Sequence, residues 1–220
     1  MRIIPNLFLE HGKAVSLYKG TDNEEKKIYP KAPRSYVEWF EKQGAKTLFI
    51  VDLSGTERER LPELRAVFSG ELWWAGHVRD IQSIQWLLDK GANRIVLGEH
   101  AEPIFTEALS LFGPEKLLAG IQAKHYDEVP NQAEKYAQMG FKDLVVKDMN
   151  AEGTLFHPNY DLMEKCAYFS KAKIYASGGV ANTNDIHLLG HAGVKGVIIG
   201  RAFYENELNL TALQDYFEPV

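Results

Sequence analysis

The sequence predicts a (β/α)8 barrel, also called a TIM barrel, built from two similar halves. Residues 75–101 and 177–203 align without a gap and share identical residues, such as Gly76 with Gly178. Short apolar runs also alternate with longer amphipathic stretches along the chain, which is typical of parallel strands joined by helical crossovers. A strand–helix unit that recurs with its glycines in place indicates a two-fold internal repeat of half-barrels.

The candidate strands are short runs rich in apolar and β-branched residues. In chain order they are Ile3–Phe8, Thr47–Leu53, Leu72–Ala75, Arg94–Leu97, Leu117–Ile121, Asp143–Lys147, Lys173–Ala176 and Gly196–Ile199. Of the adjacent pair Trp73 and Trp74, one side chain is expected to point into the barrel or the helix ring, in a packing role. The active face of such a barrel lies at the carboxyl ends of the strands.

The candidate helices are amphipathic stretches between these strands. They are Pro33–Gln43, Leu61–Phe68, Asp80–Lys90, Ile104–Leu111, Asn131–Met139, Tyr160–Phe169 and Asn184–Ala192. Glycines follow several of them, where a left-handed residue ends a helix: Gly44, Gly91, Gly140 and Gly193. No linker or shift in composition divides the chain, so we expect a single barrel domain over residues 1–220.

Composition narrows the class of protein. The net charge of −5 argues against a nucleic-acid partner or an anionic membrane surface. The sequence has no cleavable leader and no apolar run long enough to span a bilayer, so we expect a cytoplasmic protein. Cys166 is the only cysteine, and its helical context predicts a buried small hydrophobe. The oligomeric state stays open at this point.

Six segments carry a resemblance to a known family. They are RIIPNLFLEHGKAVSLYKG (2–20), FIVDLSG (49–55), GIQAK (120–124), NAEGT (150–154), ASGGV (176–180) and IIGRAFYE (198–205). Together they resemble the histidine-biosynthesis barrels over nearly the whole chain, more closely the phosphoribosylformimino-aminoimidazole carboxamide ribotide (ProFAR) isomerase than the imidazole glycerol phosphate synthase cyclase. The resemblance implies a small phosphorylated substrate with one phosphate held by each half, and no cofactor or metal.

The catalytic positions that the resemblance implies are substituted. Family members use an aspartate at the ends of the first and fifth strands as general acid and general base, and here these positions hold Phe8 and Gln122. Neither side chain transfers a proton usefully near neutral pH. The family's long loop with a stacking tryptophan after the fifth strand is also missing. The polar catalytic candidates that remain are Lys147, Asp148, Asp52 and Glu152.

Lys147 has two interpretations. A lysine at a strand end forms a Schiff base when desolvation lowers its pKa. The favoured alternative is an ion pair with Asp148 or Glu152, because neighbouring acids keep the amine protonated. Asp52 is expected to bind a hydroxyl or to orient a loop. Two further cations, Lys19 and Arg201, are candidates for contact with an anionic ligand.

The glycine-rich strand ends predict one phosphate site. Backbone N–H groups of such turns bind phosphate, and the residues for it are intact in the second half: Ser177, Gly178, Gly179, Gly200 and Arg201. A possible degenerate second site is Gly76, His77 and Gly98. There, a side chain at His77 disfavours a positive φ, and Glu99 repels an anion. A metal on Glu99 and the two neighbouring histidines, His77 and His100, fits no common ligand spacing.

These observations favour a phosphate-binding barrel enzyme that has diverged to act on a small phosphosugar by isomerase or lyase chemistry. Two alternatives remain. One is a non-catalytic phosphate-binding or scaffold barrel, in which the glycines serve packing alone. The other is ProFAR isomerase activity retained through substituted residues.

Overall fold

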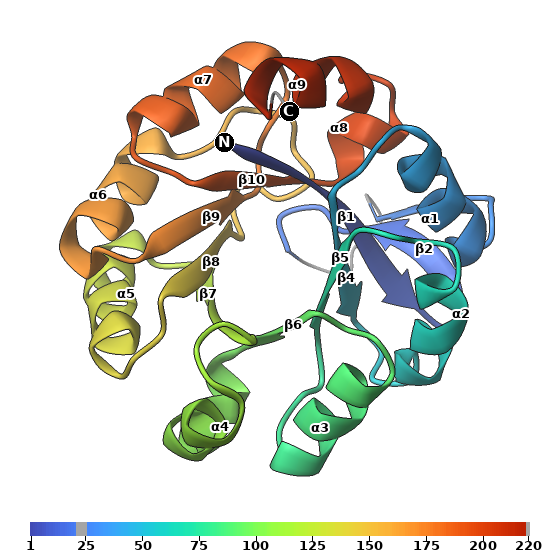
Figure 1. The fold of residues 1–220 in the computed structure, drawn as a ribbon. Helices are drawn as coiled ribbons and strands as arrows, with labels where there is room; N and C mark the ends of the chain where they lie inside the picture. The colour runs from blue at the N-terminus through green and yellow to red at the C-terminus, as the bar shows by residue number, and fades with distance from the viewer. Residues whose placement is uncertain (21–25, 219–220) are drawn as a thin grey trace.

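The computed structural model describes residues 1–20 and 26–218, and in it parallel strands close into a barrel (Figure 1). The barrel strands are β1 (Arg2–Glu10), β4 (Thr47–Asp52), β5 (Glu71–Ala75), β6 (Arg94–Leu97), β7 (Leu117–Ala123), β8 (Asp143–Asp148), β9 (Lys173–Ser177) and β10 (Gly196–Ile199). Closure comes from parallel pairing of β10 with β1, from Arg2 opposite Gly196 to Pro5 opposite Ile199. The predicted (β/α)8 fold is confirmed.

The helices form an outer ring around these strands (Figure 1). They are α1 (Pro33–Lys42), α2 (Leu61–Arg65), α3 (Ile81–Asp89), α4 (Phe105–Phe112), α5 (Val129–Gln138), α6 (Tyr160–Ser170), α7 (Thr183–His191), α8 (Arg201–Tyr204) and α9 (Leu210–Phe217), with 3-10 turns at Arg58–Arg60, Glu99–Ile104 and Tyr126–Glu128. The glycines expected after α1, α3, α5 and α7 all have positive φ, between 83° and 112°. They therefore end these helices as predicted.

Some boundaries differ from the sequence expectation. The helix expected over Leu61–Phe68 ends at Arg65, and the one expected from Asn131 begins at Val129. A hairpin of β2 (Lys13–Ser16) and β3 (Lys27–Ile28) follows β1 and was not predicted. The C-terminal helix α9 was also missed; its N-cap Asn209 accepts a hydrogen bond of 3.0 Å from the N–H of Ala212.

One inward side chain from each barrel strand fills the centre. This layer consists of Ile4, Phe49, Trp73, Val96, Leu118, Val145, Tyr175 and Ile198. The rings of Trp73 and Tyr175 meet edge to face at 4.9 Å, while Trp74 packs outward against the helices, so both tryptophans have the packing role that was expected. Because this layer is solid, a ligand is accommodated above it, at the carboxyl ends of the strands.

Candidate functional site at the carboxyl ends of the strands

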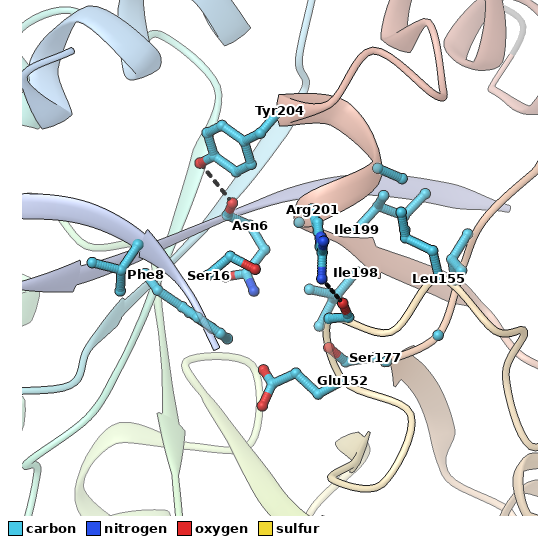
Figure 2. Close-up of a pocket in the computed structure, with 17 residues that line it drawn as sticks. Asn6, Phe8, Ser16, Glu152, Leu155, Ser177, Ile198, Ile199, Arg201 and Tyr204 are labelled. Atoms are coloured by element: carbon cyan, nitrogen blue, oxygen red, sulfur yellow. Dashed lines mark hydrogen bonds between the residues drawn. The ribbon is translucent and has the colours of Figure 1, made fainter. Parts of the chain in front are cut away.

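Two neighbouring cavities open at this end of the barrel. The smaller, of about 40 Å³, lies between the ends of β1, β9 and β10 and the loop after β8 (Figure 2). The larger, of about 390 Å³, extends over the ends of β4, β5, β6 and β7. Asn6, Phe8 and Ser177 line both cavities, so the two spaces adjoin in the middle of the mouth.

The second-half glycine turn borders the smaller cavity. Gly178 and Gly179 have φ values of 106° and 82°, a conformation that side chains rarely adopt. A Cβ atom at Gly178 would lie 2.6 Å from the carbonyl oxygen of Asp148, and one at Gly179 would collide with the carbonyl of His157. Only glycine fits here, and turns of this kind form concavities that bind anions through backbone N–H groups.

Arg201 lies in the same cavity but is already engaged. Its Nε donates to Glu205 Oε1 at 2.7 Å, and a terminal nitrogen donates to the carbonyl of Gly153 (Figure 2). Glu205 also pairs with Lys27 at 2.5 Å. Burial alone would raise the pKa of Glu205, but hydrogen bonds from these two cations lower it overall. Arg201 thus ties the loop after β8 to the start of α8 (Arg201–Tyr204), and it also lines the smaller cavity.

The first-half turn keeps the same backbone conformation. Gly76 and His77 have φ values of 98° and 53°, so the expectation that a side chain at position 77 prevents this turn is wrong. The His77 ring is turned aside, with Nε2 3.1 Å from the carbonyl of Leu53 and its face against Gly55. Glu99 is exposed and lines the larger cavity, and water around it weakens the repulsion of an anion that was expected there. The first-half turn thus differs from the second-half turn in its side chains, whereas its residues have the same positive φ.

The two substituted catalytic positions have different surroundings. Phe8 is 6% exposed and packs with Val15 and Leu17 in an apolar cluster at the mouth. Gln122 is exposed and lies beside Lys147 in the register of β7 with β8. No carboxylate stands at either position, so proton transfer needs other residues.

Lys147 and Glu152 form an ion pair at the mouth. Lys147 Nζ lies 2.5 Å from Glu152 Oε1 and 4.4 Å from the centre of the Phe8 ring. Glu152 is 5% exposed, and its second oxygen, Oε2, has no hydrogen-bond partner among the described residues. Burial raises the pKa of Glu152, and the nearby Lys147 opposes that shift only in part. Of the alternatives for Lys147, pairing with Glu152 is the one observed.

The strand-end aspartates hold loops. Asp52 accepts hydrogen bonds from the N–H groups of Gly55 at 2.6 Å and Glu57 at 3.0 Å, and it lines the larger cavity. Asp148 accepts from the Tyr126 hydroxyl and from two backbone N–H groups of the following loop, each at 3.0–3.1 Å. Asp148 lines neither cavity. Asp52 thus remains at the mouth, whereas Asp148 positions the loop that carries Glu152.

Sequence reasoning missed Asn6. It is 6% exposed, lines both cavities, and its Oδ1 is without a hydrogen-bond partner in the part of the chain that the structure describes. The available signal was strand alternation: Asn6 has the parity of Ile4 and Phe8, which face the barrel interior, so a polar residue there had to reach the mouth.

The remaining sequence expectations concern a metal site, a membrane span, Cys166 and Lys19. Within residues 1–20 and 26–218, no group of three or more His, Cys, Asp or Glu side chains is close enough to hold a metal ion, and no helix is long and apolar enough to cross a membrane. Cys166 is fully buried, which raises its pKa to about 12. Lys19 is exposed and lines neither cavity.

The closed barrel, its duplicated glycine turns and the two adjoining cavities at its mouth define a two-fold (β/α)8 barrel. The family model described as "Histidine biosynthesis protein" matches residues 2–209, and the chain belongs to this family. It is 33% identical to a protein of Campylobacter concisus with 100% of both chains covered, and 33% identical to one of Photorhabdus laumondii with 94% of this chain and 96% of the relative covered. A protein of Lactococcus lactis is 30% identical, with 96% and 97% covered.

These three relatives carry one name. Each is called a 1-(5-phosphoribosyl)-5-((5-phosphoribosylamino)methylideneamino)imidazole-4-carboxamide isomerase. This is the ProFAR isomerase that the six sequence segments resemble. The name describes a compound with two phosphoribosyl groups.

Proposed function

We propose that this chain isomerises a phosphoribosyl compound of the kind for which its relatives are named. Relatives with that name align with the chain from end to end. The first-half turn also keeps its backbone conformation and opens on a cavity of about 390 Å³, which offers room for the second end of such a compound. Both points favour retained isomerase activity over the hypothesis of an enzyme for a smaller phosphosugar, which the sequence had favoured.

In this proposal the second-half turn binds a phosphate. The residues involved are Ser177, Gly178, Gly179, Gly200 and Arg201, around the smaller cavity. The other end of the ligand lies against Gly76, His77 and Gly98 at the larger cavity. Because Phe8 and Asn6 border both cavities, the reacting ribose is expected between them.

The Lys147–Glu152 pair carries the catalytic part of the proposal. Isomerisation at a ribosylamino group moves hydrogen between neighbouring carbons, so one group must accept a proton and another must return or donate one. Glu152 is suited to accept, since burial raises the pKa of its carboxyl above the ordinary value and Lys147 lowers it only in part. Lys147 is the adjacent donor at 2.5 Å. This juxtaposition, in a mouth whose two family aspartates are replaced, is the observation that supports catalysis.

A second candidate is a smaller monophosphate sugar bound by the second half alone. The acidic Glu99 beside the first-half turn favours it by repelling a second phosphate, and the apolar Phe8 in mid-mouth favours it by occupying space between the two cavities. A scaffold barrel that binds phosphate without turnover is the third.

Turnover assays with purified protein separate these candidates. We expect conversion of the two-phosphate isomerase substrate and a loss of kcat of about a hundredfold or more in Glu152→Gln, with inorganic phosphate affinity within about twofold of the wild type. Asp161→Asn, an exposed change on α6, is the matched control. Turnover of ribulose 5-phosphate alone would move the assignment to the second candidate, and binding without any turnover to the third. Full activity in Glu152→Gln would remove the pair from the mechanism.

A further inference from the structure

An amine and a carboxyl group meet at the boundary between the two cavities. Lys147 lines the larger cavity and Glu152 lines the smaller one, and Lys147 Nζ lies 2.5 Å from Glu152 Oε1. Both side chains are mostly buried. In Figure 2 the Glu152 carboxylate extends from the loop after β8 toward Phe8. A ligand that enters the larger cavity therefore meets the amine together with an adjacent proton acceptor.

The surroundings of the pair favour transfer of its proton once a ligand excludes water. In contact with water, the Phe8 ring, 4.4 Å from Nζ, and Glu152 hold Lys147 as an ammonium ion. Apolar side chains such as Val51 and Val145 line the same cavity, and in such surroundings two opposite charges cost more than the neutral pair. Burial also raises the pKa of the Glu152 carboxyl. Glu152 is thus suited to take the Lys147 proton and to leave a neutral amine.

Lys147 also stands beside the second-half turn. It pairs in register with Ser177, the last residue of β9, which directly precedes Gly178. Neighbouring strands are about 4.8 Å apart, so the amine lies close to an anion bound at that turn. The larger cavity, of about 390 Å³, has room for the rest of such a ligand. A carbonyl group on its carbon chain then comes within reach of Nζ.

We propose that Lys147 is a nucleophile that condenses with the carbonyl group of an open-chain sugar phosphate to form an imine, a covalent activity separate from the isomerisation. The phosphate position is taken from the proposed function, but the covalent step needs no isomerase turnover. A neutral amine beside a group that accepts and returns protons is what imine formation requires.

The step balances within the pair. Lys147 gives one proton to Glu152, and its nitrogen attacks the carbonyl carbon while a second amine proton passes to the carbonyl oxygen, which gives a carbinolamine. Glu152 returns its proton to the new hydroxyl, which leaves as water as the nitrogen lone pair completes the C=N bond. The product is a protonated imine, Glu152 is unchanged, and both hydrogens of the water come from the amine.

Reductive trapping tests the proposal. The protein is incubated with ribose 5-phosphate and cyanoborohydride, and adducts are located by peptide mass spectrometry. Condensation removes water and reduction adds two hydrogens, so each adduct adds the mass of the sugar phosphate less one oxygen atom. We expect the peptide that carries Lys147 to be labelled about a hundredfold faster than the one that carries Lys124, an exposed lysine that follows β7 and lines neither cavity.

Three variants separate the nucleophile from its partner. Lys147→Arg keeps the charge that pairs with Glu152 but has no nucleophilic amine, so total labelling should fall to the background of surface lysines. Glu152→Gln should slow labelling of Lys147 about tenfold or more, because the carbinolamine then lacks the acid that expels its hydroxyl. Lys124→Met is the matched control and should be labelled like the wild type. Thermal unfolding checks that each variant is folded.

The outcomes distinguish this proposal from the proposed function. Equal labelling of Lys147 and Lys124, or unchanged total labelling in Lys147→Arg, overturns the covalent activity and leaves the isomerase to its own turnover assay. Unchanged labelling in Glu152→Gln overturns the proton transfer through Glu152. Selective labelling that excess inorganic phosphate slows supports both the imine and the phosphate turn. Selective labelling that phosphate does not slow supports the imine and contradicts the phosphate position.

Discussion

The two halves of the barrel build the same turn and then give it opposite charges. In each half a glycine with φ near 100° follows the strand, and its missing Cβ lets it lie against the carbonyl of a loop-holding aspartate: Gly76 against Asp52, and Gly178 against Asp148. After the next strand of each half, β6 or β10, the equivalent position of the repeat holds Glu99 in the first half and Arg201 in the second half. The duplicated backbone has been kept, whereas the charge that decides which anion binds has changed.

The difference also extends to the helices that follow. In the second half Asp185 is 1% exposed and accepts hydrogen bonds from the N–H groups of Ala181 and Asn182, the Tyr160 hydroxyl and His157 Nδ1. The equivalent residue in the first half is Ser83, whose N–H simply donates to the N-cap Asp80 at 2.7 Å. The glycine turn of the second half is therefore braced by a hydrogen-bond network around Asp185, and Ser83 at the equivalent place in the first half has no such network among the described residues.

The largest expected effect comes from adding a Cβ to the second-half turn. Gly178→Ala forces an alanine to a φ of 106° and against the Asp148 carbonyl, which should lower the free energy of unfolding by about 3 kcal/mol and weaken phosphate binding at least about tenfold. Gly98→Ala is the control, since its φ is −83° and a Cβ there meets nothing within 4 Å, so stability should change by less than about 0.5 kcal/mol. Urea unfolding and calorimetry measure both. Equal behaviour of the two variants would show that the turn geometry is irrelevant.

The second-largest expected effect is a pH-dependent loss of stability when the Asp185 carboxylate is replaced. Burial alone would raise the pKa of Asp185, but the hydrogen bonds from Ala181, Tyr160 and His157 lower it overall, below its ordinary value of 3.8. A carboxylate with a lowered native pKa stabilises the fold above pH 4, and this contribution is lost as the pH falls through the native pKa. Asp185→Asn should thus cost about 2 kcal/mol at pH 7 and much less at pH 2.5. Urea unfolding of both proteins at the two pH values measures it.

The matched first-half change is Ser83→Ala, which should alter stability by less than about 0.5 kcal/mol at either pH. A cost for Asp185→Asn that is the same at both pH values would mean that the charge of the carboxylate is not what stabilises the turn.

The repeat and the alternation of apolar runs were enough to predict the barrel, its strands and the glycines that end α1, α3, α5 and α7. They were not enough for β3, because a two-residue strand has no periodicity to read. They also missed α8, a four-residue helix, and α9, which lies beyond the last repeated unit. The internal repeat and hydrophobic periodicity thus predict elements that recur, and they do not predict an element that is very short or occurs only once.

The site was predicted in part for a similar reason. The glycines predicted the turn in the second half, but His77 was expected to disfavour it in the first half, and the structure shows that His77 adopts a positive φ nevertheless. An ion pair of Lys147 with Asp148 or Glu152 was expected, but which of the two acids pairs with it depends on the loop after β8. This loop is held in place because Lys19 N–H donates to the Glu152 carbonyl at 2.7 Å and Gly153 lies against Leu17. Such tertiary contacts join residues more than a hundred positions apart, and no spacing rule reports them.

The charge difference between the halves can be tested by neutralising Glu99. Glu99→Gln removes one exposed negative charge beside the first-half turn, which should strengthen binding of a second phosphate roughly tenfold at low ionic strength, because a unit charge about 4 Å from a dianion in a water-like surrounding costs on the order of 1 to 2 kcal/mol. The gain should largely vanish in 1 M salt. Glu107→Gln, an exposed change on α4, is the control. Calorimetry with inorganic phosphate that finds the same stoichiometry and affinity in both variants would contradict an electrostatic origin for the inequality.

The smallest expected difference concerns the helix caps behind the two turns. Asp80 caps α3 with one hydrogen bond, whereas Asn182 caps α7 in a reciprocal pair with Asp185, in which each side chain accepts from the other's backbone N–H. Loss of a single exposed cap should cost about 0.5 kcal/mol in Asp80→Ala, and loss of the reciprocal cap about 1 kcal/mol in Asn182→Ala. Urea unfolding at pH 7 resolves the order of the two values. If Asp80→Ala proved the more costly, the bracing of the second half would have to come from the Tyr160 and His157 side chains rather than from the cap.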